Sequence, residues 1–161
     1  MIQRINYKKS IDVYETINRI KDAYQDFYVT INKARVFLNN WHIIKKILNT
    51  QEVYALSTND TKGLLILYKE KGFRPYVKIL AEDSDSQRDL IKFLIWNFSD
   101  KDLFIKLKKA NPLARIIQRY GFIFQGDRGQ EILLFRKGER KSNKPLGEKD
   151  DDNFIQNPRS Y

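Results

Sequence analysis

The stretch that decides the fold is NPLARIIQRYGFIFQGDRGQEILLFRK, residues 111–137. Asn111 and Pro112 suit the N-cap and the first position of a helix. Gly121 suits the left-handed residue that ends one. Between them runs an apolar stripe of Leu113, Ile116, Ile117 and Tyr120. Two further apolar runs flank turn residues at 126–129, which predicts a short helix followed by a β-hairpin.

Upstream of this stretch we expect a strand and a buried helix. Apolar and lysine side chains alternate over residues 102–110, as in a strand with one buried and one solvated face. Ser84 suits a helix N-cap, with Gln87 at the third helical position. The helix that follows is apolar on nearly every side and should pack deeply on a sheet; its apolar residues are Leu90, Ile91, Phe93, Leu94, Ile95, Trp96 and Phe98.

The N-terminal half predicts two helices and a three-stranded meander. A short strand over residues 2–7 precedes a helix from Asp12, whose capping box would be Asp12 with Glu15. The apolar face of this first helix would be Val13, Ile17, Ile20 and Tyr24. A second helix is expected over residues 32–48. Strands then follow over residues 52–57, 64–68 and 76–81, with turns at 59–63 and 71–75.

This order of elements resembles the GNAT superfamily of N-acetyltransferases. The resemblance covers roughly residues 1–136, and its most specific part is residues 111–137. Asn111, Ala114, Gly121 and Phe122 match the family's segment in which a helix leaves the fifth strand and a Gly-Phe pair begins the sixth. It implies an α/β (α+β) fold: a mixed, mostly antiparallel sheet flanked by helices, here followed by a polar C-terminal tail. The domain would span residues 1–137 and the tail 138–161.

The resemblance also implies acetyl-CoA, whose pyrophosphate would lie on the N-terminus of the helix after the fourth strand. The family's glycine-rich pattern is missing there, because residues 81–92 contain no glycine. Ser86, Gln87 and Arg88 are the residues that would bind the cofactor. Four carboxylates surround the place, Glu82, Asp83, Asp85 and Asp89. The alternative is that these residues only cap a helix and that the site is degenerate.

The candidate catalytic residues are Glu82, Asn111 and Tyr120. Glu82 follows the fourth strand, where some family members keep a base, and Asn111 matches a family position near the cofactor. The tyrosine that often protonates the departing thiolate in the family falls here on Ile117 or Gln118, neither of which can act as that acid. Tyr120 is the nearby alternative, although its place on the apolar stripe favours a core role.

Charge and composition bear on partners. The net charge is +10, of which residues 136–161 supply a surplus of two, with seven Lys/Arg against five Asp/Glu. The basic body could bind nucleic acid or a phosphate-bearing ligand, or be a solvated face; its clustered residues are Lys106, Lys108, Lys109, Arg115 and Arg119. The tail has few apolar residues and by itself should be disordered. Its small apolar island, Phe154 with Ile155, could dock on a partner protein.

Other features exclude function classes. With no cysteine and one histidine, His42, we expect no metal site. The apolar runs are too short for a membrane span of roughly 20 residues, and no secretory signal is expected. We therefore expect a cytoplasmic protein. If a phage encodes it, we expect it in the host cytoplasm or in the virion. The usage of Lys, Asn and Ile suits an AT-rich genome, bacterial or phage.

Three functions are compatible with the sequence. The first is a GNAT-fold protein that has lost catalysis and acts as a binding or structural module. The second is an acyl-CoA-dependent N-acetyltransferase acting on an amine of a protein or small molecule. The third is a basic, nucleic-acid-associated protein.

Overall fold

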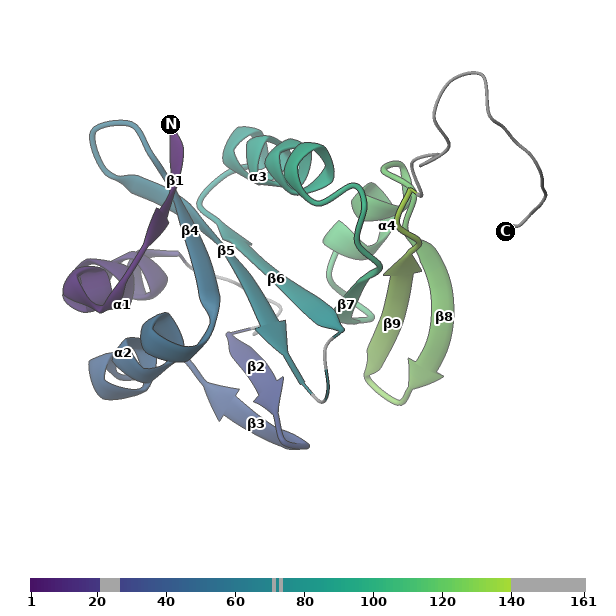
Figure 1. Ribbon diagram of the computed structural model, residues 1–161, viewed down its shortest axis with the longest axis horizontal. Helices are drawn as coiled ribbons and strands as arrows, with labels where there is room; N and C mark the ends of the chain where they lie inside the picture. Colours follow the sequence, from purple (N-terminus) through teal and green to yellow (C-terminus); the bar gives the residue numbers. More distant parts are fainter. Residues whose placement is uncertain (21–26, 71, 73, 140–161) are drawn as a thin grey trace, which may run out of the picture.

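The computed structural model describes residues 1–20, 27–70, 72 and 74–139. It centres on one seven-stranded sheet, whose arrangement with the helices can be followed in Figure 1. The strands run in the order β1-β4-β5-β6-β7-β9-β8. Their bounds in that order are Ile2–Ile5, Glu52–Ser57, Thr61–Lys69, Pro75–Ala81, Leu103–Lys108, Glu131–Arg136 and Ile123–Arg128. Every neighbouring pair is antiparallel except β6 with β7. The predicted mixed, mostly antiparallel sheet is confirmed.

Helices cover both faces of this sheet. The 3-10 turn η1 (Tyr7–Lys9), α1 (Ser10–Arg19) and α2 (Trp41–Thr50) lie on one side of it; α3 (Ser84–Asn97) lies on the other side, as does α4 (Leu113–Gln118) (Figure 1). Each face has its own core cluster, because strand residues alternate between the two. None of the helices within the described ranges is long and apolar enough to span a bilayer.

The helix predicted over residues 32–48 is wrong in its first part. A separate hairpin of β2 (Tyr28–Ile31) and β3 (Ala34–Phe37) precedes α2. Asn32 and Lys33 form its two-residue turn, with φ of 52° and 67°. The apolar residues of this stretch satisfy a two-residue period as well as a helical one, so periodicity alone did not separate the alternatives. Helix α2 then begins after Asn40, whose Oδ1 accepts from the Ile43 N–H at 3.0 Å.

The first helix also starts earlier than predicted. Since α1 begins at Ser10, Asp12 lies in its first turn and does not cap it, and the Asp12–Glu15 capping box is wrong. The Asp12 carboxylate instead accepts from the Thr61 hydroxyl at 2.9 Å and ties α1 to β5. Tyr24, predicted for the face of this helix, lies outside the described residues.

Helix α3 differs from the prediction at its cap and on its outer side. Asp83, not Ser84, is the N-cap residue, and its Oδ1 accepts from the Ser86 N–H at 2.8 Å. Leu90, Ile91 and Leu94 are completely buried against the sheet, but Trp96 is 83% exposed. The helix therefore buries one face, and its apolar residues are not all core.

The turn of the C-terminal hairpin is shorter than the predicted one at residues 126–129. Gly121 ends the α4 turn with φ of +95°, as expected. Residues 126–128 belong to β8, however, and the turn falls at Gly129 with φ of +80°. Beyond β9, Gly138 N–H donates to Asp102 at 2.8 Å, so the chain still contacts the start of β7. The rest of the predicted tail, residues 140–161, lies outside the described residues.

Candidate functional site

The two parallel strands of the sheet separate along their length. Strands β6 and β7 are paired only at Tyr76 with Phe104 and at Val77 with Ile105. Beyond these pairs β6 continues on β5 as far as Ala81, and β7 continues on β9 as far as Lys108. The C-terminal halves of β6 and β7 thus diverge, and the starts of α3 and α4 follow their two ends. The antiparallel pairs on either side, β5 with β6 and β7 with β9, keep an unbroken register.

The start of α3 is built as a helix cap. The N–H of Ser86 donates a hydrogen bond to the Asp83 carboxylate. Arg88 Nη2 lies 3.0 Å from Asp85 Oδ1, which pairs that guanidinium within the helix. The hydrogen bonds from Ser86, the backbone one first, hold the pKa of the Asp83 carboxyl below its usual value. Of the predicted cofactor residues Ser86, Gln87 and Arg88, the first and third therefore already have partners in the cap.

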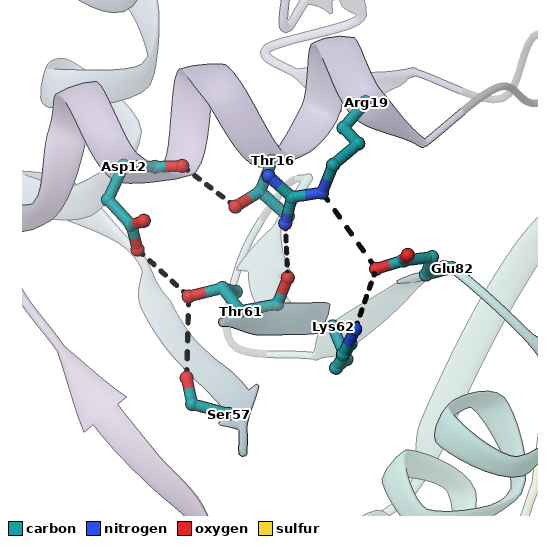
Figure 2. Close-up of polar contacts among 7 residues, drawn as sticks. All are labelled: Asp12, Thr16, Arg19, Ser57, Thr61, Lys62 and Glu82. Atoms are coloured by element: carbon teal, nitrogen blue, oxygen red, sulfur yellow. Dashed lines mark hydrogen bonds and ion pairs between the residues drawn. The ribbon is translucent and has the colours of Figure 1, made fainter. Parts of the chain in front are cut away.

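Glu82, the predicted base, lies in a salt-bridge network between α1 and the sheet (Figure 2). Its Oε1 is 3.9 Å from Arg19 Nε and 3.8 Å from Lys62 Nζ. Arg19 also donates to the Thr61 carbonyl at 2.5 Å. Thr61 is the first residue of β5, and its hydroxyl donates to the Asp12 carboxylate (Figure 2). The Glu82 carboxylate thus lies between two cationic side chains, one from α1 and one from β5.

The start of α4 places the other two candidates apart. Asn111 Oδ1 accepts from the Leu113 N–H at 3.0 Å, but the N-cap residue of the short helix is Pro112 and not Asn111 as predicted. Tyr120 lies partly buried against the core, beyond the end of α4. At the family's tyrosine position, Ile117 is fully buried, and Gln118 Nε2 donates to the Ala114 carbonyl at 3.0 Å. No general acid lies at that position.

The structure brings three of the five predicted basic residues into one hollow of about 490 Å³ around the start of α4. Lys109, Arg115 and Arg119 line it together with Asn111. Lys109 is paired with Asp127 at 2.7 Å, and Arg115 and Arg119 are exposed. This hollow lies at the end of β7, on one side of the divergence, and its charge suits an anionic ligand.

Two buried lysines stand at the point where β6 and β7 part, and sequence reasoning did not single out this pair. Lys78 and Lys106 each follow the last paired residue of their strand, and they are 2% and 8% exposed. Both point away from α3, because their neighbours Val77, Ile79, Ile105 and Leu107 belong to the core under α3 and α4. A lysine is almost never this buried unless it is paired. The signal available in the sequence was the lysine inside each apolar strand.

Aromatic rings and two carboxylates surround these lysines. Lys78 Nζ lies 4.8 Å from the centre of the Tyr28 ring, and Lys106 Nζ lies 5.4 Å from that of Tyr76. Lys106 Nζ is 2.5 Å from Glu70 Oε2. The Tyr28 hydroxyl donates to Glu131, which also pairs with Arg35 at 3.6 Å. The β2–β3 hairpin thus covers part of this face through Tyr28 and Arg35.

A second hollow lies at the opposite end of β6 and β7. It measures about 560 Å³ and is lined by Arg4, Arg74, Lys101 and Asp102, among others. Nearby, burial and a 2.5 Å hydrogen bond to Glu52 raise the pKa of Tyr54 to about 12. Within the described part of the chain, no three histidines or carboxylates gather as a metal site, and His42 is exposed and stacks on Trp41.

Comparison with solved structures identifies the architecture. An N-acetyltransferase from Staphylococcus aureus Mu50 superposes with a TM-score of 0.66 at 16% identity, covering 85% of this chain and 96% of that one. The ribosomal-protein-S5-alanine acetyltransferase of Vibrio fischeri gives 0.60 at 10% identity, over 86% and 92%. A spermidine N-acetyltransferase mutant from Vibrio cholerae gives 0.58 at 10%, over 85% and 94%. No family model and no curated protein matches the sequence.

The fold is therefore that of the GNAT N-acetyltransferases, as the resemblance of residues 111–137 implied. Strands β6 and β7 are the two that the sequence resemblance matched to the family's fourth and fifth strands, and α3 and α4 follow them along the chain.

Proposed function

We propose that this chain is an acyl-CoA-dependent N-acetyltransferase. The observation that carries the proposal is the divergence of β6 from β7 after two pairs, with α3 and α4 starting at its two sides. A break between parallel strands leaves backbone groups available to a ligand that lies between them. Solved neighbours of the same fold include enzymes named for acetylating spermidine and a ribosomal-protein alanine.

Acetyl-CoA would supply an acetyl thioester: the amine nitrogen of the acceptor forms the new C–N bond while the C–S bond breaks, the amine proton passes to water and the thiolate takes a proton. Its acyl arm would lie at the divergence between β6 and β7. The basic hollow of Lys109, Arg115 and Arg119 would hold phosphate groups by charge. Asn111, which also lines that hollow, would orient the arm. Glu82 is not assigned a part, because its two salt bridges keep it in the α1–sheet network.

A second candidate remains, the binding or structural module without catalysis, and the cap of α3 favours it. Asp83 already bonds the Ser86 N–H, and Asp85 and Asp83 place negative charge where the fold would put a pyrophosphate. A phosphate group there would have to displace the Asp83 carboxylate or bind beside it.

Calorimetric titration with acetyl-CoA separates the two candidates. The enzyme predicts saturable binding that is weakened when Arg115 and Arg119 are both changed to Gln, because a phosphate loses its cations. The matched control is K46Q/K92Q, which removes two exposed positive charges from α2 and α3. If millimolar acetyl-CoA gives no heat and no rise in the thermal midpoint, the enzyme proposal fails and the module remains.

A further inference from the structure

The exposed side of α2 and the adjoining turn η1 bring rings and lysines together on one surface. Helix α2 packs beside η1 and α1, at the end of the molecule away from α4 (Figure 1). The apolar side of α2 is buried in the core, so its polar side faces solvent. We define the η1–α2 surface by six exposed residues, three with rings and three lysines: Tyr7, Trp41, His42, Lys8, Lys9 and Lys45.

The rings of this surface are accessible from solvent. Trp41 is 40% exposed and Tyr7 is 45% exposed. Trp41 stacks on His42 with the ring centres 3.8 Å apart, so two ring systems lie together at the start of α2. Lys45 follows Trp41 by one turn on the same side of the helix, and its Nζ is 5.8 Å from the centre of the Tyr7 ring. A cation therefore lies between the exposed rings of η1 and α2.

The charge of the η1–α2 surface has one sign. Neither η1 nor α2 contains an aspartate or a glutamate. Its three lysines form no ion pair within the described ranges. On the neighbouring helix α1, Asp12 is bound to the Thr61 hydroxyl, and Glu15 lies about a turn further from η1. A surface with positive charge alone attracts an anionic partner.

We propose that the η1–α2 surface binds single-stranded nucleic acid, with its lysines on phosphates and with Trp41 and Tyr7 stacked on bases. Exposed rings beside a positively charged track are the features by which proteins bind single strands, because every base has a flat face and every nucleotide a phosphate. This binding is independent of the proposed acetyltransferase function, since none of the six residues lines either hollow.

The rings favour this partner over other polyanions. An acidic peptide or an anionic membrane would satisfy the lysines without using the flat faces of Trp41 and His42. A duplex would also be held by its phosphates, but its bases are already stacked inside the helix. Single strands alone combine phosphates with base faces that are free to stack.

The first test is titration of the full chain, without acetyl-CoA, into fluorescently labelled dodecamers of thymidylate and of uridylate, followed by anisotropy. We expect saturable binding of at least one strand, tighter than that of a duplex of the same length. Three phosphate contacts predict that the affinity falls roughly twentyfold between about 50 and 200 mM salt. No binding at low salt, or equal affinity for the duplex or for polyglutamate, overturns the proposal.

Tryptophan fluorescence locates the stacking. The chain has two tryptophans, and Trp96 lies 83% exposed on α3, on the other side of the sheet. W96F therefore leaves Trp41 as the single reporter, and W41F leaves Trp96. We expect the single strand to quench the fluorescence of W96F and not that of W41F. Quenching in W41F alone, or in neither variant, would show that no base stacks on Trp41.

Charge variants separate this surface from the net charge of the chain. K8Q/K45Q removes two lysines of the η1–α2 surface, and K92Q/K137Q removes two exposed lysines from α3 and from the end of β9. The first pair should weaken binding severalfold and reduce the salt dependence, whereas the second should change little. W41A should weaken binding by about five- to a hundredfold, provided that its thermal midpoint shows a folded chain. Equal losses in the two lysine pairs overturn the proposal, whether or not acetyl-CoA binds.

Discussion

Replacing Gly63 with Ala tests how closely α3 packs on the sheet, and so whether its N-terminus is held at the divergence of β6 and β7. Gly63 lies inside β5, where a Cβ atom would be 2.8 Å from Leu90 Cδ1 and 2.9 Å from the Leu80 carbonyl oxygen. The leucine methyl can rotate away. The carbonyl belongs to β6, in the paired part of the sheet, and cannot move without disturbing the β5–β6 ladder.

The expected cost follows from these two contacts. Overpacking a core position usually costs about 1–3 kcal/mol, and the alanine regains about 0.5–1 kcal/mol because glycine loses more chain entropy on folding. We therefore expect G63A to lower the free energy of unfolding by about 1–2 kcal/mol, and the thermal midpoint by roughly 2–8 °C for a domain of this size. Chemical denaturation and a thermal scan both measure this.

Gly126 supplies the matched control. It is also a strand glycine, but no atom lies within 4 Å of its added Cβ, and its φ lies outside the left-handed range. G126A should leave the free energy of unfolding within about 0.5 kcal/mol. In the double variant G63A/L90A, the loss should be smaller than the sum of the single losses, because the leucine methyl no longer meets the new Cβ. If G63A is as stable as G126A, the close approach of Gly63 to the Leu80 carbonyl is wrong; if the losses in G63A/L90A simply add, the contact between Leu90 of α3 and this part of β5 is wrong.

Three further predictions address charges in the fold. D83N keeps an oxygen that accepts from the Ser86 N–H but removes a negative charge at the start of α3. Calorimetry should therefore show tighter binding of acetyl-CoA to D83N than to the control D89N. An unchanged or weaker affinity in D83N would contradict the placement of a pyrophosphate there. K106M leaves Glu70 buried without its cation and should lower the free energy of unfolding by about 3 kcal/mol. The double variant E70L/K106M should recover most of this loss of stability. Equal losses in the single and the double variant would show that the ion pair is not the cause. Because the pKa of Tyr54 is raised to about 12 from 10.0 in the unfolded chain, its contribution to stability is complete below pH 10 and is lost as the pH rises toward 12. Between these pH values, the free energy of unfolding measured with denaturant should therefore fall less in Y54F than in the unaltered chain. If the two proteins lose the same free energy of unfolding over this pH range, the raised pKa of Tyr54 is not the cause.

The elements that the sequence predicted well are those whose local signals agree. In residues 111–137, the apolar stripe and Gly121 indicate the same short helix and recur in the structure, although the helix begins one residue later than predicted, with Pro112 as its N-cap residue. The order of strands could also be inferred, because turns and alternation mark each strand of the meander. Local signals failed where the same residues fit two alternative secondary structures. Residues 32–48 fit a helix and a hairpin alike. Gly63 was predicted to lie in a turn, but it lies inside β5, where Leu90 of α3 approaches it closely.

The candidate site was predicted only in part, because its main features depend on pairing between distant strands. Glu82 could be placed after a strand, but its two cations come from α1 and β5, which sequence spacing does not bring together. Lys78 and Lys106 are far apart in the chain and become neighbours only through the parallel pairing of β6 with β7. Tyr28 and Arg35 reach them from a hairpin that the sequence predicted as helix.

The most direct test of the account is to map acetyl-CoA on the labelled chain by amide chemical shifts. The account predicts shifts along the diverging ends of β6 and β7, at Ile79 and Leu107, and in the hollow of Arg115 and Arg119. Shifts confined to the opposite hollow, at Arg74 and Asp102, would contradict it. So would an absence of shifts at millimolar acetyl-CoA.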